Sequence, residues 1–139
     1  MQPVNLQLEL MKRGMQREEA DEYLDSGPEI TFAVWYGGRH DCASVAEVLV
    51  VLDDGVDVLP SYTGRREFPW RRSAITDWRS GALTTEPGSW RLSSHTFTGY
   101  SMGVRRAILV LRGKDERFWA GHYGSKFSAP ELYFGTCRF

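Results

Sequence analysis

The segment FWAGHYG at 118–124 concentrates the side chains best suited to binding a ligand. It holds Phe118, Trp119, His122 and Tyr123, and charged residues stand directly before it. The apolar C–H face of a pyranose stacks on such rings while its hydroxyls bond to nearby polar groups. The interleaved glycines argue against an ordinary core strand, which favours β-branched residues. Two alternatives stay open: a sugar-stacking surface, or rings that close the end of a β-sandwich.

A second candidate is the arginine-rich segment 65–79, in which Trp70 and Trp78 are interleaved with basic residues. Arginine beside aromatic rings is typical of proteins that bind single-stranded nucleic acid. The contact would involve Arg65, Arg66, Arg71 and Arg72. The alternative is an exposed insertion whose tryptophans dock on the fold. The net charge of -1, from 17 basic and 18 acidic residues, disfavours nucleic acid as a partner.

Catalytic and metal-binding patterns are weak. Cys42 lies beside His40 and Asp41, but adjacent side chains on an extended loop point apart, which disfavours a catalytic dyad. The three histidines are isolated, and neither Cys42 nor Cys137 belongs to a CxxC pair. The sequence contains no GxGxxG, GKS, GKT or GxSxG motif. We therefore expect a binding protein with no catalytic residue, metal or cofactor, and not an enzyme.

Strands must position these side chains. The 139 residues, 42% hydrophobic and 25% charged, suit one globular domain over 1–139. Alternating apolar residues predict a strand over 4–10, and the acidic run 16–25 predicts a short exposed helix or turn. Further strands are expected at 30–36, 45–52, 90–97, 104–111 and 132–134, with Asp53-Asp54-Gly55 as a turn before a return strand at 56–59. Residues 113–115 are expected to form a loop, and about 60–89 a long irregular one.

Short strands separated by turn signals favour an all-β, antiparallel sandwich. We expect six side chains in or near one core: Val48, Val50, Leu52, Trp90, Leu109 and Leu111. No apolar run approaches the roughly 20 residues of a membrane span. The first residues lack the apolar centre and the cleavage site of a signal peptide. We therefore expect a cytoplasmic protein that does not interact with membranes.

The stretch 94–127 resembles the signature of the F-box-associated (FBA) domain of glycoprotein-recognising F-box proteins and of the nonspecific cytotoxic cell receptor protein. The matching residues there are Ser94-His95-Thr96-Phe97, Gly103-Val104-Arg105, Trp119, Gly121, Tyr123 and Gly124. Upstream, the same family pattern is matched by Tyr23-Leu24-Asp25, Pro28, Trp35-Tyr36, Arg39 and Asp41. The resemblance covers about 6–135.

This resemblance implies an antiparallel sandwich of jelly-roll, galactose-binding-like type. Glycan-binding members recognise the inner chitobiose of N-linked high-mannose chains through loops at one end of the sandwich. By position, the resemblance makes Phe118 and Trp119 the pair that stacks on the sugar. It makes Asp41 the carboxylate that accepts hydrogen bonds from sugar hydroxyls. The expected partners are N-glycosylated proteins, in the manner of the substrate-recognition domain of F-box ubiquitin-ligase subunits.

The sequence also departs from the family pattern. Phe118 stands where glycan binders commonly have tyrosine, and the turn Tyr100-Ser101-Met102-Gly103 lacks the usual first glycine and proline. The chain carries no F-box and is short at its N-terminus, so we expect no binding to the ligase adaptor. The alternative function is a protein-interaction module with the same fold and no sugar affinity. Nucleic-acid contact through the arginine-rich segment is the weaker alternative.

Overall fold

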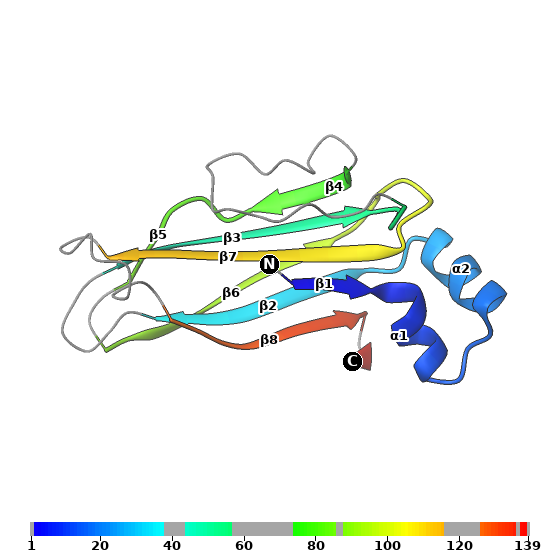
Figure 1. Cartoon of the computed structure of the whole chain (residues 1–139), viewed down its shortest axis with the longest axis horizontal. Helices are drawn as coiled ribbons and strands as arrows, with labels where there is room; N and C mark the ends of the chain where they lie inside the picture. Colours follow the sequence, from blue (N-terminus) through cyan, green and yellow to red (C-terminus); the bar gives the residue numbers. More distant parts are fainter. Residues whose placement is uncertain are drawn as a thin grey trace.

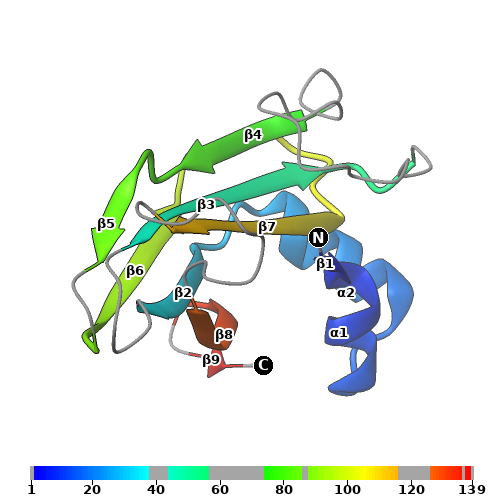
Figure 2. The same cartoon turned by 60° about the vertical axis from the view of Figure 1, so that its left-hand side comes forward.

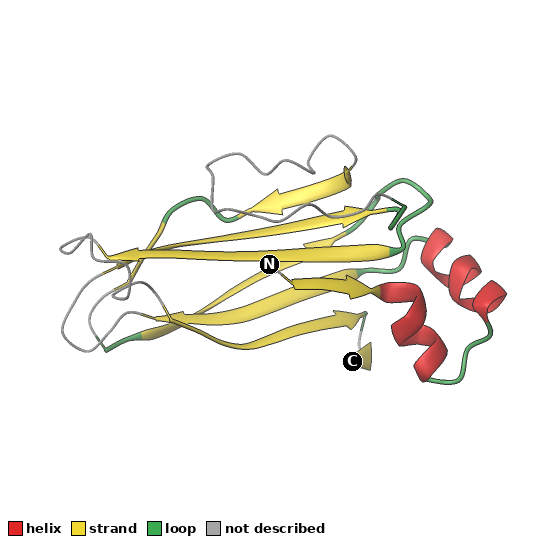
Figure 3. Cartoon of the chain, in the orientation of Figure 1, coloured by secondary structure: helices red, strands yellow, loops and turns green. Residues whose placement is uncertain are grey.

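Two antiparallel sheets pack face to face, and a pair of short helices covers one end (Figures 1 and 3). The computed structural model describes residues 2–37, 44–56, 74–85, 88–115, 126–135 and 137–138. The five-stranded sheet is formed by β1 (Gln2–Asn5), β7 (Arg106–Asp115), β3 (Ser44–Asp53), β4 (Ala74–Arg79) and β5 (Leu83–Thr85). The four-stranded sheet is formed by β6 (Trp90–Phe97), β2 (Ile30–Gly37), β8 (Lys126–Phe134) and β9 (Cys137–Arg138). The predicted antiparallel β-sandwich is confirmed.

The core lies between the two sheets. Phe32, Val34, Phe97 and Phe134 enter it from the four-stranded sheet. Val48, Val50, Leu52 and Leu109 enter from the five-stranded sheet, and Leu111 packs against them, as predicted. The expectation for Trp90 was wrong, because its side chain is 48% exposed. Strand β6 turns Ser93 and Phe97 inward, which leaves Trp90 on the outer face.

The first helix replaces the predicted strand over 4–10. Only Gln2–Asn5 forms a strand, and α1 (Leu6–Lys12) follows directly. The side chain of Asn5 accepts a hydrogen bond from the backbone N–H of Leu8, which caps the helix. Leu6 and Leu10, four residues apart, are buried together, whereas Leu8 between them is 45% exposed. A spacing of four suits a helix as well as a strand, so alternation alone misassigned this segment.

The second helix, α2 (Arg17–Asp25), agrees with the short helix predicted for the acidic run. Only one side of α2 faces solvent. On the other side, Ala20 and Leu24 are fully buried and anchor the helix to the core. Helices α1 and α2 sit together at the right-hand end of the sandwich in Figure 1. In the part of the chain that the structure describes, no helix is long and apolar enough to cross a membrane.

The expected return strand at 56–59 lies largely outside the described residues. Asp53-Asp54-Gly55 does form a turn: Asp53 Oδ1 accepts from the Gly55 N–H at 3.0 Å, and Gly55 has a positive φ of 74°. Val56, however, is exposed and lies outside any strand, and residues 57–60 lie outside the described ranges. The antiparallel neighbours of β3 on that side are β4 and β5. Part of the segment expected to be irregular is therefore sheet.

Strand β7 also runs further than predicted, because 113–115 continue the ladder with β3 instead of forming a loop. Asp115 lies opposite Ser44 at the far end of this ladder, and Asp53 lies opposite Arg106 at the near end. The two ten-residue strands thus span the molecule from the helical end to the opposite end. They form the rigid frame on which that opposite end is built.

Candidate functional site

The strand ends that flank both predicted sugar-binding segments come together at one end of the sandwich. Strand β2 ends at Gly37, which lies opposite Lys126, the first residue of β8. Strand β3 begins at Ser44, which lies opposite Asp115, the last residue of β7. The segments 38–43 and 116–125 therefore begin and end on these neighbouring strand ends, at the left of Figure 1. The helices lie at the other end.

The three predicted site residues, Asp41, Phe118 and Trp119, lie outside the described residues. Their side-chain positions stay predictions. The described ends of strands β2 and β7 nevertheless fix where the segments that carry these residues are attached. Asp41 is four residues from Gly37, and Phe118 and Trp119 are three and four residues from Asp115. All three are thus tethered by short segments to the same end of the sandwich.

Trp90 lies at this same end of the sandwich, although its sequence context did not predict a site residue. It is the first residue of β6 and lies opposite Gly37. A Cβ atom at position 37 would lie 2.5 Å from the carbonyl oxygen of Ser89 and 3.0 Å from Cδ2 of Trp90. Only glycine permits this approach of the β6 chain and the indole to the end of β2. The signal in the sequence was the Gly37-Gly38 pair that directly follows an aromatic strand.

A stack of rings between the sheets fixes the neighbouring part of β6. Trp78 of β4 stacks on His95 of β6 with ring centroids 4.9 Å apart, and Phe97 contacts His95 edge-on at 4.7 Å. Burial lowers the pKa of His95 below its usual 6.5, so the neutral imidazole is favoured. Trp78 packs against the core and joins the sheets. Trp78 makes this contact from strand β4, which is paired with β3 and is not an exposed insertion, while 65–73 lie outside the described ranges.

A carboxylate–guanidinium cluster fixes the opposite, helical end. Arg105 contacts Asp21 at 2.9 Å through Nε and both carboxylate oxygens of Asp25 at 2.9 and 3.1 Å. Asp25 also accepts from the Gly103 N–H at 2.9 Å. The hydrogen bond from Arg105 and then that from Gly103 lower the pKa of Asp25. Two carboxylates of the acidic run, expected only to form an exposed helix or turn, therefore make structural contacts with Arg105.

This cluster also explains part of the resemblance physically. Tyr23-Leu24-Asp25 and Gly103-Val104-Arg105, widely separated in the sequence, meet here. The Tyr100 hydroxyl donates to the carbonyl oxygen of Pro28 across the same junction. Burial raises the pKa of Tyr100 to about 12. These motif residues join the helices to the sheets, so their role is structural.

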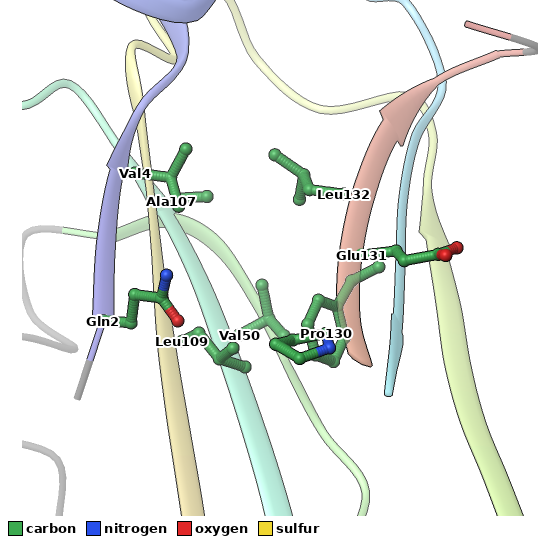
Figure 4. Close-up of a pocket in the computed structure, with 9 residues that line it drawn as sticks. Gln2, Val4, Val50, Ala107, Leu109, Pro130, Glu131 and Leu132 are labelled. Carbon is green, nitrogen blue, oxygen red and sulfur yellow. The ribbon is translucent and has the colours of Figure 1, made fainter. Parts of the chain in front are cut away.

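An apolar cavity opens between the two sheets along one side of the molecule (Figure 4). Its lining comes from β1, β7 and β3 on one sheet and from β2 and β8 on the other, and includes Val4, Val50, Leu109, Pro130 and Leu132. In Figure 4 the Glu131 carboxylate points away from the cavity. The volume of about 60 Å³ is far below the roughly 300 Å³ of ordinary ligand pockets. This cavity is a gap in core packing and not the candidate site.

Within the described part of the chain, no three His, Cys, Asp or Glu side chains are grouped so that they could hold a metal ion. The buried charged group there, Asp53, is paired with Arg106 at 2.6 Å. Its role is to hold β3 to β7. The end of the sandwich that bears Gly37, Trp90 and the two predicted segments is thus the candidate site, seen from another side in Figure 2.

Comparison with known proteins identifies the family of the chain. The family model described as the F-box associated region matches residues 7–131. Human F-box only protein 27 is 35% identical over 107 residues, which are 76% of this chain and 33% of that protein. Bovine F-box only protein 6 is 29% identical over 119 residues, 86% of this chain and 39% of that protein. Human F-box only protein 17 is 33% identical over 105 residues, 75% of this chain and 34% of that protein. The chain spans about a third of the length of these relatives, and it belongs to the F-box associated family.

Proposed function

We propose that this chain is a recognition module that binds the chitobiose core of N-linked glycans on glycoproteins. In the proposal, Phe118 and Trp119 stack on the sugar and Asp41 accepts hydrogen bonds from its hydroxyls. The observation that carries it is the pairing of Gly37 with Lys126 and of Ser44 with Asp115. Because of this pairing, the two segments that carry the proposed binding residues, 38–43 and 116–125, are both attached at one end of the sandwich.

The chemistry proposed is binding without catalysis. A stacked ring and a carboxylate recognise the two sides of a pyranose, its apolar C–H face and its hydroxyls. Membership of the F-box associated family supports a further proposal, that the chain selects substrates as part of a ubiquitin ligase. In a longer protein, an F-box would supply the adaptor contact, and this sandwich would supply the substrate contact.

The test is a titration of the purified chain with chitobiose and with a high-mannose glycopeptide. We expect Trp119→Ala to weaken both interactions by about 2 kcal/mol or more, on the order of thirtyfold, because it removes a stacked ring at the centre of the site. Asp41→Asn weakens binding less, because the amide oxygen still accepts a hydrogen bond. The control is Leu8→Ala, an exposed position on α1 at the opposite end, which leaves affinity unchanged.

Phe118→Tyr is the sharper probe, because it restores the hydroxyl that glycan binders commonly carry. We expect an increase in affinity from the additional hydrogen bond. If a folded wild type and a folded Phe118→Tyr variant both fail to bind glycan, the proposal is wrong. Pull-down of a deglycosylated protein substrate as efficiently as the glycosylated one would instead support a protein-interaction module without sugar affinity.

A further inference from the structure

The outer face of the four-stranded sheet has an unusual distribution of side chains. On β6, Ser94 and Thr96 face outward near the helical end, and the Thr96 hydroxyl contacts that of Thr31 at 2.9 Å. Toward the other end the outward side chains become apolar. Leu92 is 51% exposed, and Trp35, opposite it on β2, is 44% exposed. The outer face of an antiparallel sheet is usually polar, so an exposed tryptophan in the row nearest the candidate site is a candidate contact for a ligand.

Of these apolar side chains, Trp90 lies nearest the end of the sheet that forms the candidate site, and its ring packs over Gly37 of β2. A methyl group at Gly37 would lie 3.0 Å from Cδ2 and 3.2 Å from Cε3 of the indole, so the ring lies close against the β2 backbone. With 48% of its surface exposed, Trp90 still presents a large part of the ring to solvent. A ring that is already positioned loses little conformational entropy on binding, which favours its use as a contact surface.

The position of Trp90 connects it to the proposed glycan site. Gly37 lies between Trp90 on β6 and Lys126 on β8, so the three residues form one row across the end of the sheet. Gly37 directly precedes 38–43, and Lys126 directly follows 116–125. The end row is therefore flanked by both segments that carry the proposed disaccharide site, and the exposed indole of Trp90 lies in this row. This ring is a surface that a glycan longer than the disaccharide can reach.

We propose that Trp90 is a second sugar-stacking residue, which contacts a hexose of the glycan beyond the chitobiose core. This inference rests on the proposed function and adds a specificity determinant to it. The ring supplies an apolar face for the C–H side of a neutral hexose. Because the contact lies outside the disaccharide, it selects for the length of the glycan. Trp90 therefore distinguishes an intact high-mannose chain from its trimmed core.

The test is calorimetric titration of wild type, Trp90→Ala and Trp35→Ala with two protein-free ligands, chitobiose and a released high-mannose glycan. We expect Trp90→Ala to weaken binding of the long glycan about tenfold, as for loss of one favourable stacking contact, and to change chitobiose binding less than twofold. Trp35→Ala is the matched control. It removes the same ring from the same face at similar exposure, one row further from the site, and we expect less than a twofold change with either ligand.

A second variant and a spectroscopic measurement distinguish the loss of a sugar contact from misfolding of the variant. Trp90→Phe keeps an aromatic ring, and we expect it to retain most of the affinity for the long glycan. The indole N–H resonance of Trp90 is the one that is absent from the NMR spectrum of Trp90→Ala. In wild type, we expect this resonance to shift when the long glycan is added and to stay unchanged when chitobiose is added. Urea unfolding midpoints establish that the variants compared are folded.

Three results would overturn the inference. Unchanged binding of the long glycan by Trp90→Ala would exclude a contact. An equal loss for both ligands would show that Trp90 only supports the disaccharide site. A loss seen with a glycopeptide but not with the released glycan would assign the ring to polypeptide. In each case Trp119→Ala reports separately on the proposed function, and failure of wild type to bind any glycan would reject both proposals.

Discussion

The cross-strand pair Asp53–Arg106 allows a sharp test of what holds the central strands together. The two residues lie opposite each other on β3 and β7, and Arg106 donates to both carboxylate oxygens at 2.9 and 2.6 Å. Asp53 is 1% exposed, and the Arg106 side chain is 14% exposed. Water therefore cannot replace a lost partner. We predict that Asp53→Asn, which keeps the shape and removes the charge, destabilises the fold substantially.

The magnitude follows from the bonds that are lost. Each charge-assisted hydrogen bond contributes about 1.5–3 kcal/mol, and breaking a buried ion pair costs about 3–5 kcal/mol. The asparagine oxygen can still accept one bond, so we expect a loss of about 3 kcal/mol. With a urea dependence of about 2 kcal/mol per molar, the unfolding midpoint falls by about 1.5 M. Equilibrium urea unfolding followed by tryptophan fluorescence measures this shift.

The matched control is the exposed pair Glu9–Lys12 on α1, whose charged atoms are 3.5 Å apart. Because the Lys12 side chain is 62% exposed and that of Glu9 is 33% exposed, solvent screens the pair, and Glu9→Gln should change the free energy of unfolding by less than about 0.5 kcal/mol. Combining Asp53→Asn with Arg106→Met should cost clearly less than the sum of the single changes. A loss below about 1 kcal/mol for Asp53→Asn, or strict additivity in the double variant, would refute the reasoning.

Two further predictions concern pH. Because Arg105 lowers the pKa of Asp25, the stability from this cluster is complete above the usual pKa of 3.8 and is lost as the pH falls through and below it. Asp25→Asn should therefore flatten the acid side of the stability curve, and an unchanged acid midpoint would contradict this. Because burial lowers the pKa of His95, the unfolded chain binds more protons near its usual pKa of 6.5, and stability falls as the pH drops through that value. His95→Phe, which keeps a ring against Trp78, should reduce the difference between urea midpoints at pH 8 and pH 5; an equal difference in variant and wild type would exclude the effect.

Strand periodicity in the sequence predicted the sandwich because most inward-facing side chains of β2, β3 and β7 are strongly apolar. It failed where two patterns coincide. Leu6 and Leu10 fit both a strand and a helix, and the side-chain cap from Asn5 decides between them. On β6, apolar residues occur on both faces, so the sequence could not show that Trp90 points outward. Whether Trp90 points inward or outward depends on which face of β6 packs against the other sheet, and this is a property of the tertiary structure.

For the candidate site, the sequence could indicate residue types but not their arrangement. Asp41 and Trp119 are far apart along the chain, and only the register of Gly37 with Lys126 and of Ser44 with Asp115 connects their segments. Trp90 was missed because its proximity to Gly37 depends on the same kind of non-local pairing. The helical cluster was also unpredictable in detail, since Asp25 and Arg105 are 80 positions apart in the sequence and meet only through the tertiary fold.

The topology has a consequence for how the chain reaches its folded state. Gln2 pairs with Leu109 and Ile30 pairs with Phe134, so each pairing joins residues about a hundred positions apart, and folds of this kind acquire structure slowly. During synthesis, the apolar strand β2 emerges long before β8, its last neighbour. Until then it exposes an unpaired, aromatic edge of the kind that promotes aggregation. The interval between the synthesis of β2 and that of β8 is therefore the period in which the nascent chain is most exposed to aggregation.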